Sequence, residues 1–141
     1  MKKILILGGG FAGIYTAKNL QKQRLHNCEV ELISDNNYFI FQPLLPEVAS
    51  GTIYSSDAVT PIRQMLKGIK YRNAEISGLD FENKKISILQ GFKKSTHYIS
   101  YDHLVIALGQ VSNLDIVKGL KDHAFTMRSL QDAYDLRNHI L

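Results

Sequence analysis

Three glycines near the start of the chain have the spacing of a phosphate-binding turn. Residues 8–13 read GGGFAG, which fits G-x-G-x-x-G. In this pattern Gly8 allows a tight turn, Gly10 lets the backbone approach a pyrophosphate, and Gly13 allows close helix–strand packing. The segment follows an apolar run and opens a periodic one, which is the context the motif requires. It predicts a dinucleotide site; a glycine-rich turn without a ligand is the alternative.

The acidic residue that normally accompanies this turn is displaced. An Asp or Glu at the end of the second strand usually binds the ribose hydroxyls. Here Ser34 occupies that place and Asp35 follows it. Two interpretations stay open: Asp35 turns inward, or Ser34 and the backbone hold the ribose less strongly. The motif does not distinguish FAD from NAD.

Residues 38–52 form a second segment that suggests a ligand. The sequence YFIFQPLLPEVASGT holds two prolines and several apolar side chains in a region without clear periodicity. Such side chains are costly to leave in water, so they are expected to pack on something flat and apolar. Ordinary core packing is the alternative.

The third segment, YDHLVIALG at residues 101–109, is an apolar run that ends in small residues. At the carboxyl edge of a parallel sheet, small residues let the backbone lie against a ligand. A simple strand-to-loop turn is the alternative.

Several classes of site are not supported. The five histidines have no metal-ligand spacing and no partnered nucleophile, and the single Cys28 excludes an internal disulfide and fits a reducing compartment. The net charge of +4 comes from scattered lysines, not from the dense basic face of a nucleic-acid binder. The apolar run at residues 4–7 is too short for a signal peptide or a membrane span, so we expect a soluble, cytoplasmic chain.

The elements that would position these residues indicate an α/β fold. Apolar residues 4–7, a helical period over 11–24 and a second strand at 29–34, which carries Val30, Leu32 and Ile33, make a βαβ unit. A Rossmann-type parallel sheet with a small antiparallel β-meander insertion follows from the rest of the pattern. The remaining expected elements are a helical turn near 45–49 in an irregular segment 35–60, a helix at 61–67, a strand at 69–76, meander strands at 79–81, 85–89 and 96–99, a strand at 104–107, and a helix from Ser129 opened by a capping box.

Taken together, the motifs resemble a known family. The order GGGFAG, NNYFIFQPLLPEVASG, PIRQML, YRNAE, YDHLVIALG and MRSLQDAYDLRNHIL is similar to type II NADH dehydrogenases. These are two-dinucleotide-binding-domain flavoproteins of the pyridine nucleotide-disulfide oxidoreductase superfamily. The resemblance covers essentially the whole chain but only about the first third of a typical member.

The resemblance implies a set of FAD-binding positions. They are Gly8, Gly10, Phe11, Ala12 and Gly13 at the pyrophosphate; Ser34, Asp35 and Asn36 at the adenosine ribose; Gln42, Pro43, Leu44 and Leu45 against the flavin ring; Ala74, Glu75 and Ile76, whose backbone meets adenine; and Ala107, Leu108 and Gly109 in place of the family's Ala-Thr-Gly. Because Leu108 lacks the hydroxyl of threonine, only a backbone role carries over there.

The resemblance also implies an activity. Members bind FAD non-covalently, accept hydride from NADH on a second domain and pass electrons to a membrane quinone. That second G-x-G-x-x-G and the later Gly-Asp segment are absent, so residues 1–141 are expected to be an N-terminal FAD-binding domain that is incomplete and not competent alone. The implied partners are NADH and quinone, with no nucleic acid. Peripheral contact with the inner face of the cell membrane, through the missing C-terminal part, and a homodimer belong to the same expectation.

Three alternatives remain at this stage. A sulfide:quinone reductase has a similar N-terminal part but needs redox cysteines, and only Cys28 is present. A truncated dinucleotide-binding module would have no activity of its own. An NAD-only dehydrogenase would need an acid–base residue, and none stands out. We name no catalytic side chain and no metal ligand in this segment.

Overall fold

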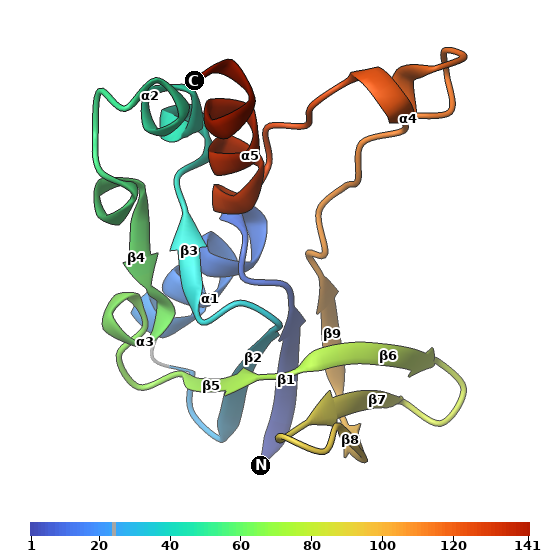
Figure 1. Cartoon of the computed structure of the whole chain (residues 1–141). Coiled ribbons are helices and arrows are strands. Elements are labelled where there is room, and N and C mark those ends of the chain that lie inside the picture. Colours follow the sequence, from blue (N-terminus) through green and yellow to red (C-terminus); the bar gives the residue numbers. More distant parts are fainter. Residues whose placement is uncertain (24) are drawn as a thin grey trace. The chain divides into compact units, whose positions relative to one another are not determined.

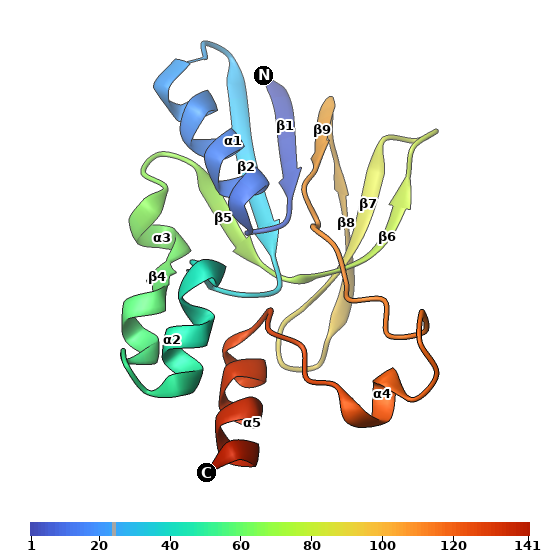
Figure 2. The ribbon, with the colours of Figure 1, turned by 90° about the horizontal axis from the view of Figure 1, so that it is seen from above.

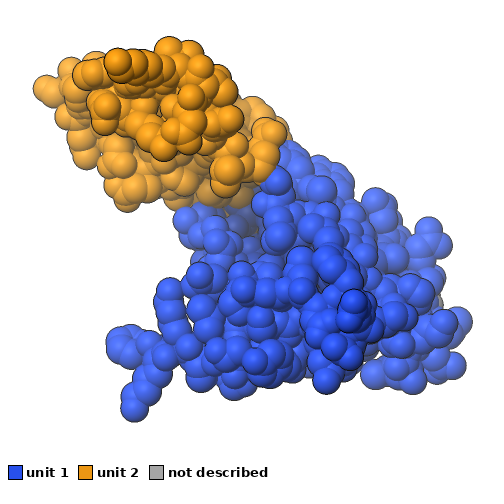
Figure 3. Space-filling view, turned by 90° about the vertical axis from the view of Figure 1, so that its right-hand side faces the viewer, with its two compact units in different colours: residues 1–39, 61–109 blue, residues 40–60, 110–141 orange. Residues whose placement is uncertain are grey.

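The structure is a computed structural model that describes residues 1–23 and 25–141. The chain forms two compact units (Figure 3). Unit 1 comprises Met1–Phe39 and Pro61–Gly109, and unit 2 comprises Ile40–Thr60 and Gln110–Leu141.

Unit 1 is built on a four-stranded parallel sheet (Figure 1). Its strands are β1 (Lys2–Leu7), β2 (Cys28–Ser34), β5 (Lys70–Asn73) and β9 (His103–Ile106), in the order β5-β2-β1-β9. All three pairs of neighbouring strands are parallel. The predicted α/β class with a Rossmann-type sheet is therefore confirmed.

Helix α1 (Phe11–Gln23) connects β1 to β2 and covers one face of the sheet (Figure 2). Its buried residues Ile14 and Ala17 pack in a core cluster with Ile6 and Leu32 of the strands. The predicted helix end at Arg24 lies outside the described residues. Residues 5–7 at the end of β1 are all apolar because side chains on both faces of this strand are buried.

The opposite face is covered by the predicted meander. Strands β6 (Glu75–Asp80), β7 (Lys85–Gln90) and β8 (Ser95–Ser100) form an antiparallel sheet in that order. A second core cluster joins the two sheets: it holds Leu5, Leu7, Ile33, Ala74, Ile86, Ile88, Ile99 and Tyr101. The meander insertion is confirmed.

The strand predicted at 69–76 is wrong as one element. The chain forms β5 up to Asn73, leaves the parallel sheet at Ala74 and enters the meander as β6. The Asn73 side-chain amide donates to the backbone carbonyl oxygens of Ser34 and Asp35, and the Ala74 N–H donates to the Ser34 carbonyl oxygen at 2.9 Å. No Gly or Pro in the sequence marks this change from one sheet to the other.

The segment predicted as irregular contains short regular elements. Strands β3 (Tyr38–Ile40) and β4 (Val59–Pro61) pair with each other. Helix α3 (Ile62–Met65) is shorter than the predicted helix at 61–67, with Pro61 at its N-cap instead of in its first turn. The side chain of Ile62 is buried in the core cluster of α1.

Unit 2 is mainly helical. It contains the 3-10 turns η1 (Gln42–Leu44) and η2 (Ser55–Ala58) with the helices α2 (Leu45–Ser50), α4 (Leu120–His123) and α5 (Leu130–Ile140). Its core cluster is formed by Leu45, Val48, Ala58 and Ala133. Helix α2 confirms the helical turn expected near 45–49.

Helix α5 begins at the predicted capping box. The Asp132 N–H donates to Ser129 Oγ at 3.1 Å, and the Ser129 N–H donates to Asp132 Oδ2 at 3.1 Å. Burial raises the pKa of Asp132, but hydrogen bonds to its carboxylate outweigh burial and hold the pKa below its usual value. In the described part of the chain, no helix combines the length and apolarity needed to cross a bilayer.

Candidate dinucleotide site

The glycine turn lies where the carboxyl ends of β1 and β9 meet. Gly8 has a φ of 107°, and a Cβ there would collide with the carbonyl oxygen of Ala107. A Cβ on Gly13 would collide with the carbonyl oxygen of Gly8. The first and third glycines are therefore fixed by close packing, and Ala107 lies directly against the turn.

Gly10 has a different environment. No heavy atom lies within 4 Å of the position that a Cβ on Gly10 would occupy. The residue stands directly before α1, whose first turn leaves backbone N–H groups without intrahelical acceptors and carries a partial positive charge. Open space at a helix N-terminus fits a pyrophosphate, so the residues present are compatible with a dinucleotide.

Gly9, which the motif treats as a variable position, is also constrained. A Cβ there would lie 2.7 Å from Ser34 Oγ and 2.8 Å from Ile62 Cδ1. The turn therefore packs against the end of β2 and the start of α3. The sequence pattern gave no signal for this contact, because both partners are distant along the chain.

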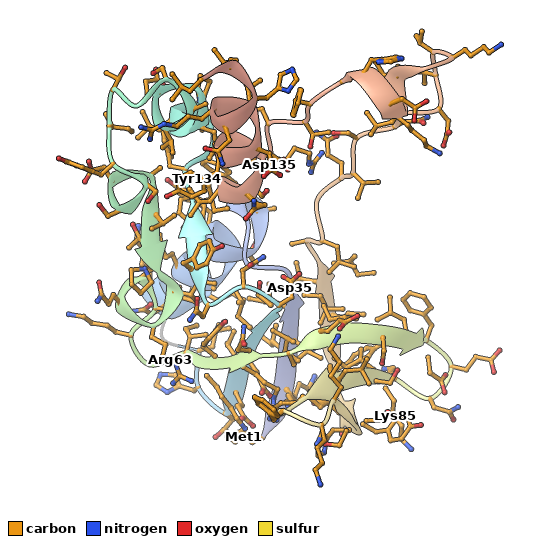
Figure 4. All side chains as sticks on the ribbon, viewed as in Figure 1. Met1, Asp35, Arg63, Lys85, Tyr134 and Asp135 are labelled. Carbon is orange, nitrogen blue, oxygen red and sulfur yellow. The ribbon has the colours of Figure 1, made fainter. Side chains whose placement is uncertain are left out.

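At the end of β2 the two candidate ribose residues differ in burial. Ser34 is buried, with 4% of its surface exposed, whereas Asp35 is exposed. Ser34 Oγ donates to Asp35 Oδ1 at 3.4 Å, and Asn36 Nδ2 donates to the same oxygen at 3.2 Å. Figure 4 labels Asp35, which follows β2. Both of these hydrogen bonds end on Oδ1 of the Asp35 carboxylate, and the Asp35 side chain remains exposed.

Two β5 residues that sequence reasoning missed position this turn. Asn73 Nδ2 donates to the carbonyl oxygens of Asp35 at 2.8 Å and Ser34 at 3.2 Å. Tyr71 Oη donates to the Asn36 carbonyl oxygen at 2.9 Å, and burial raises the pKa of the Tyr71 phenol. A neutral phenol retains the proton that this hydrogen bond needs. The turn after β2 is thus held from β5.

Residues 74–76, which were predicted to contact adenine, lie in three different environments. Ala74 is buried beside Ser34. Glu75 extends to Lys94, with Nζ 3.0 Å from Oε2, and Ile76 packs against the core of the meander. The backbone N–H of Ala74 donates to the Ser34 carbonyl oxygen at the end of β2.

At the end of β9 the predicted residues diverge in exposure. Ala107 N–H donates to the Leu7 carbonyl oxygen at 2.8 Å, which extends the sheet by one bond. Leu108 is 53% exposed, and Gly109 adopts a φ of 76° that favours glycine. The backbone role predicted for this segment fits its geometry.

The predicted flavin-facing turn lies in unit 2. Gln42 Nε2 donates to the Arg128 carbonyl oxygen at 3.2 Å, and Pro43 and Leu44 complete η1. Leu45 is fully buried in the core of unit 2. The Leu45 side chain therefore serves packing, which was the alternative stated for this segment.

Comparison with known proteins decides the family. The sequence profile described as pyridine nucleotide-disulphide oxidoreductase matches residues 2–141. The chain belongs to the pyridine nucleotide-disulphide oxidoreductase family. The match covers the glycine turn, the parallel sheet and the meander.

Three known proteins show what the chain is similar to. The type II NADH:quinone oxidoreductase of Staphylococcus aureus is 35% identical over 99% of this chain and 34% of that protein. NDH2 of Plasmodium falciparum, solved in complex with NADH, has a TM-score of 0.85 at 30% identity and is matched over 96% of this chain and 28% of its own. The sulfide:quinone oxidoreductase of Aquifex aeolicus has a TM-score of 0.84 at 26% identity, over 99% of this chain and 32% of its own.

The matched region is a minor part of these proteins. This chain spans between 25% and 35% of the length of the curated relatives that match it first. The resemblance to type II NADH dehydrogenases is confirmed at the level of these relatives.

Proposed function

We propose that the protein transfers electrons from NADH through FAD to a quinone, and that residues 1–141 supply its N-terminal FAD-binding part. In this proposal the NADH-binding domain and the C-terminal part lie outside these residues. The observation that carries the proposal is the open position at Gly10, before the N-terminus of α1, in a chain 35% identical to a type II NADH:quinone oxidoreductase.

The pyrophosphate of FAD would lie over the glycine turn. The backbone of Gly8, Gly10, Phe11, Ala12 and Gly13 would line this part of the site. The N–H groups of the first turn of α1 would donate to phosphate oxygens, and the helix dipole would favour their negative charge. Since Gly8 and Gly13 are fixed by packing, the turn is formed before any ligand arrives.

Asp35 would hold the adenosine ribose. Its exposed carboxylate can accept hydrogen bonds from both hydroxyls of a ribose, as the displaced acid of the motif does. Ser34 is buried and donates to Asp35, so it would orient the carboxylate. Asn36 would assist from the same turn, and the backbone at residues 74–76 would meet adenine.

In unit 1, the backbone of residues 107–109 would approach the flavin ring. When bound, the flavin supplies acceptance of hydride and release of electrons; the protein supplies position and electrostatics. We assign no catalytic side chain to this segment. A quinone is membrane-soluble, so the proposal includes peripheral contact with the inner face of the cell membrane.

A chimaera tests the activity. Residues 1–141 would replace the equivalent third of the S. aureus enzyme, with which they share 35% identity. We expect the FAD-loaded chimaera to reduce quinone with NADH, and the 141 residues alone to bind FAD without turnover. A folded, FAD-loaded chimaera that uses no NADH would contradict the proposal.

Sulfide:quinone reduction is the second candidate, because the A. aeolicus enzyme has nearly the same TM-score as NDH2. Its identity to this chain is lower, and Cys28 is the only cysteine in residues 1–141. Assaying the full-length protein that carries residues 1–141 with NADH and, separately, with sulfide distinguishes the two. Quinone reduction with sulfide and not with NADH would favour this second candidate.

A further inference from the structure

The turn after β2 is exposed, but its backbone is held at four consecutive positions. Residues 35–37 are exposed, whereas the carbonyl oxygens of residues 34–37 all accept hydrogen bonds from later parts of unit 1. The donors are Ala74 N to Ser34 at 2.9 Å, Asn73 Nδ2 to Asp35 at 2.8 Å, Tyr71 Oη to Asn36 at 2.9 Å and Ile62 N to Asn37 at 3.0 Å. The backbone that carries the Asp35 carboxylate is therefore fixed, although the side chain itself faces solvent.

Two of these donors are side chains of β5, and the strand geometry explains why both reach the turn. Tyr71 and Asn73 are two residues apart in β5, so their side chains lie on the same face of the sheet. Arg72, between them, points to the other face and pairs with Glu31. The ladder between β2 and β5 ends at the pair Ser34 and Asn73. Beyond this pair, the side chains of Tyr71 and Asn73 continue the hydrogen bonding that β5 gives to β2.

The polar groups of these two side chains are committed to the turn. An amide nitrogen has two N–H donors, and Asn73 Nδ2 donates to the carbonyl oxygens of Ser34 and Asp35. The same nitrogen lies 3.2 Å from Tyr71 Oη, so the two side chains also contact each other. On the other side, Arg63 Cζ of α3, labelled in Figure 4, lies 5.4 Å from the centroid of the Tyr71 ring. A cation at this distance is attracted to the ring and helps to fix its orientation.

We infer that Tyr71 and Asn73 are positioning residues for the adenosine ribose of FAD. They hold the turn in the conformation in which the Asp35 carboxylate meets the ribose hydroxyls, and they act through Asp35 without touching the ribose. This inference rests on the proposed function. A binding group that is ordered before its ligand arrives avoids the free-energy cost of being ordered on binding. The two β5 side chains therefore increase the preference of the site for a cofactor with an intact ribose.

Flavin titrations of the full-length apoprotein that carries residues 1–141 test this role. The two ligands are FAD and an FAD analogue that has 2′,3′-dideoxyadenosine in place of adenosine, and flavin fluorescence reports their binding. Asn73→Ala and Tyr71→Phe should each lower the preference for FAD over the analogue by about three- to tenfold. Both variants should leave the affinity for the analogue unchanged. Tyr98→Phe is the matched control, because it removes the hydroxyl of an exposed tyrosine in β8 and should leave the preference unchanged.

A double variant separates positioning from direct contact. If Asn73 acts through Asp35, the preference of Asp35→Asn combined with Asn73→Ala should equal that of Asp35→Asn alone, because effects of coupled residues are not additive. Additive losses would show that Asn73 contacts the cofactor itself and would overturn the inference. Equal weakening of both ligands, together with a lower melting temperature, would show a purely structural role and would also overturn it. Tyr71→Phe removes a single oxygen atom, so it keeps the test valid if Asn73→Ala does not fold.

The titrations distinguish failure of this inference from failure of the proposed function. A wild-type protein that binds no FAD, or that binds FAD and the analogue equally, would contradict the assignment of the ribose to Asp35, and the inference would fall with it. A wild-type protein that prefers FAD, with Asn73→Ala and Tyr71→Phe variants that keep the full preference, would overturn the inference alone.

Discussion

Lys3 Nζ lies 2.8 Å from Glu31 Oε2, and the Glu31 side chain is fully buried within β2. Arg72 Nε lies 2.7 Å from the other oxygen of the same carboxylate, and its Nη1 donates to Gln90 Oε1 at 3.1 Å. One buried carboxylate therefore joins β1, β2 and β5, and Arg72 extends the network to the meander.

This network predicts a pH dependence of stability. Burial raises the pKa of Glu31, but Lys3 and Arg72 outweigh it and hold the pKa below its ordinary value of 4.5. A lowered folded-state pKa contributes stability above the ordinary value, and this stability is lost as the pH falls through the folded-state pKa. Glu31→Gln should cost about 1–3 kcal/mol at pH 7, measured by urea unfolding. The cost should shrink below pH 4.5; a constant cost down to acid pH would contradict this role.

The contact between Gly9 and Ser34 predicts coupled stability effects. Gly9→Ala would press a methyl group against Ser34 Oγ and Ile62, which should lower the free energy of unfolding by about 1–3 kcal/mol. Ser34→Ala removes the hydroxyl and should restore part of the loss in the double variant. Urea unfolding of the four proteins gives the coupling energy. Strict additivity would show that the two residues do not press on each other.

Gly10 and Gly13 should respond differently to the same substitution. Gly10→Ala enters open space, so it should leave the melting temperature unchanged and weaken FAD binding at least about tenfold by filling the phosphate position. Gly13→Ala collides with the backbone of Gly8 and should destabilise the fold itself. Thermal melts and FAD titrations of both variants separate the effects. Unimpaired FAD binding by Gly10→Ala would place the phosphates elsewhere.

The proposed hydrogen bonds from Asp35 to the ribose can be tested by comparing two ligands, one with and one without the ribose hydroxyls. Asp35→Asn should weaken ADP binding by about tenfold or more, because a hydrogen bond to a charged group contributes about 1.5–3 kcal/mol. With 2′,3′-dideoxy-ADP the loss should disappear, since the hydroxyls are absent. Glu82→Gln, which removes an exposed charge from the β6–β7 turn, is the matched control. An equal loss for both ligands would show a general charge effect instead of ribose recognition.

The parts of the fold that local chemistry determines could be predicted. The β1–α1–β2 unit follows from an apolar run, a glycine turn and a helical period, and α5 from a capping box at Ser129. The change of sheet at Ala74 could not be predicted, because the alternation of residues continues through it without Gly or Pro.

Long-range contacts limited the prediction of the site. The glycine turn gives no indication that Gly9 packs on Ser34 and Ile62, which lie 25 and 53 positions further along the sequence. In the sequence, Tyr71 and Asn73 do not differ from other strand residues. Their contacts with the turn after β2 follow from the sheet order, in which β5 lies beside β2. The sequence leaves both Ser34 and Asp35 open as ribose residues, and the proposal for Asp35 rests on burial, which a single sequence does not supply.

The most direct test of the central claim is a titration of the purified 141-residue chain with FAD and with FMN, followed by desalting and an absorption spectrum. FMN carries the same flavin ring but lacks the adenosine and the pyrophosphate that the glycine turn and Asp35 would bind. We predict that FAD remains with the protein, and that FMN is lost or held at least about tenfold more weakly. Equal retention of both flavins, or of neither, would contradict a dinucleotide site at this turn.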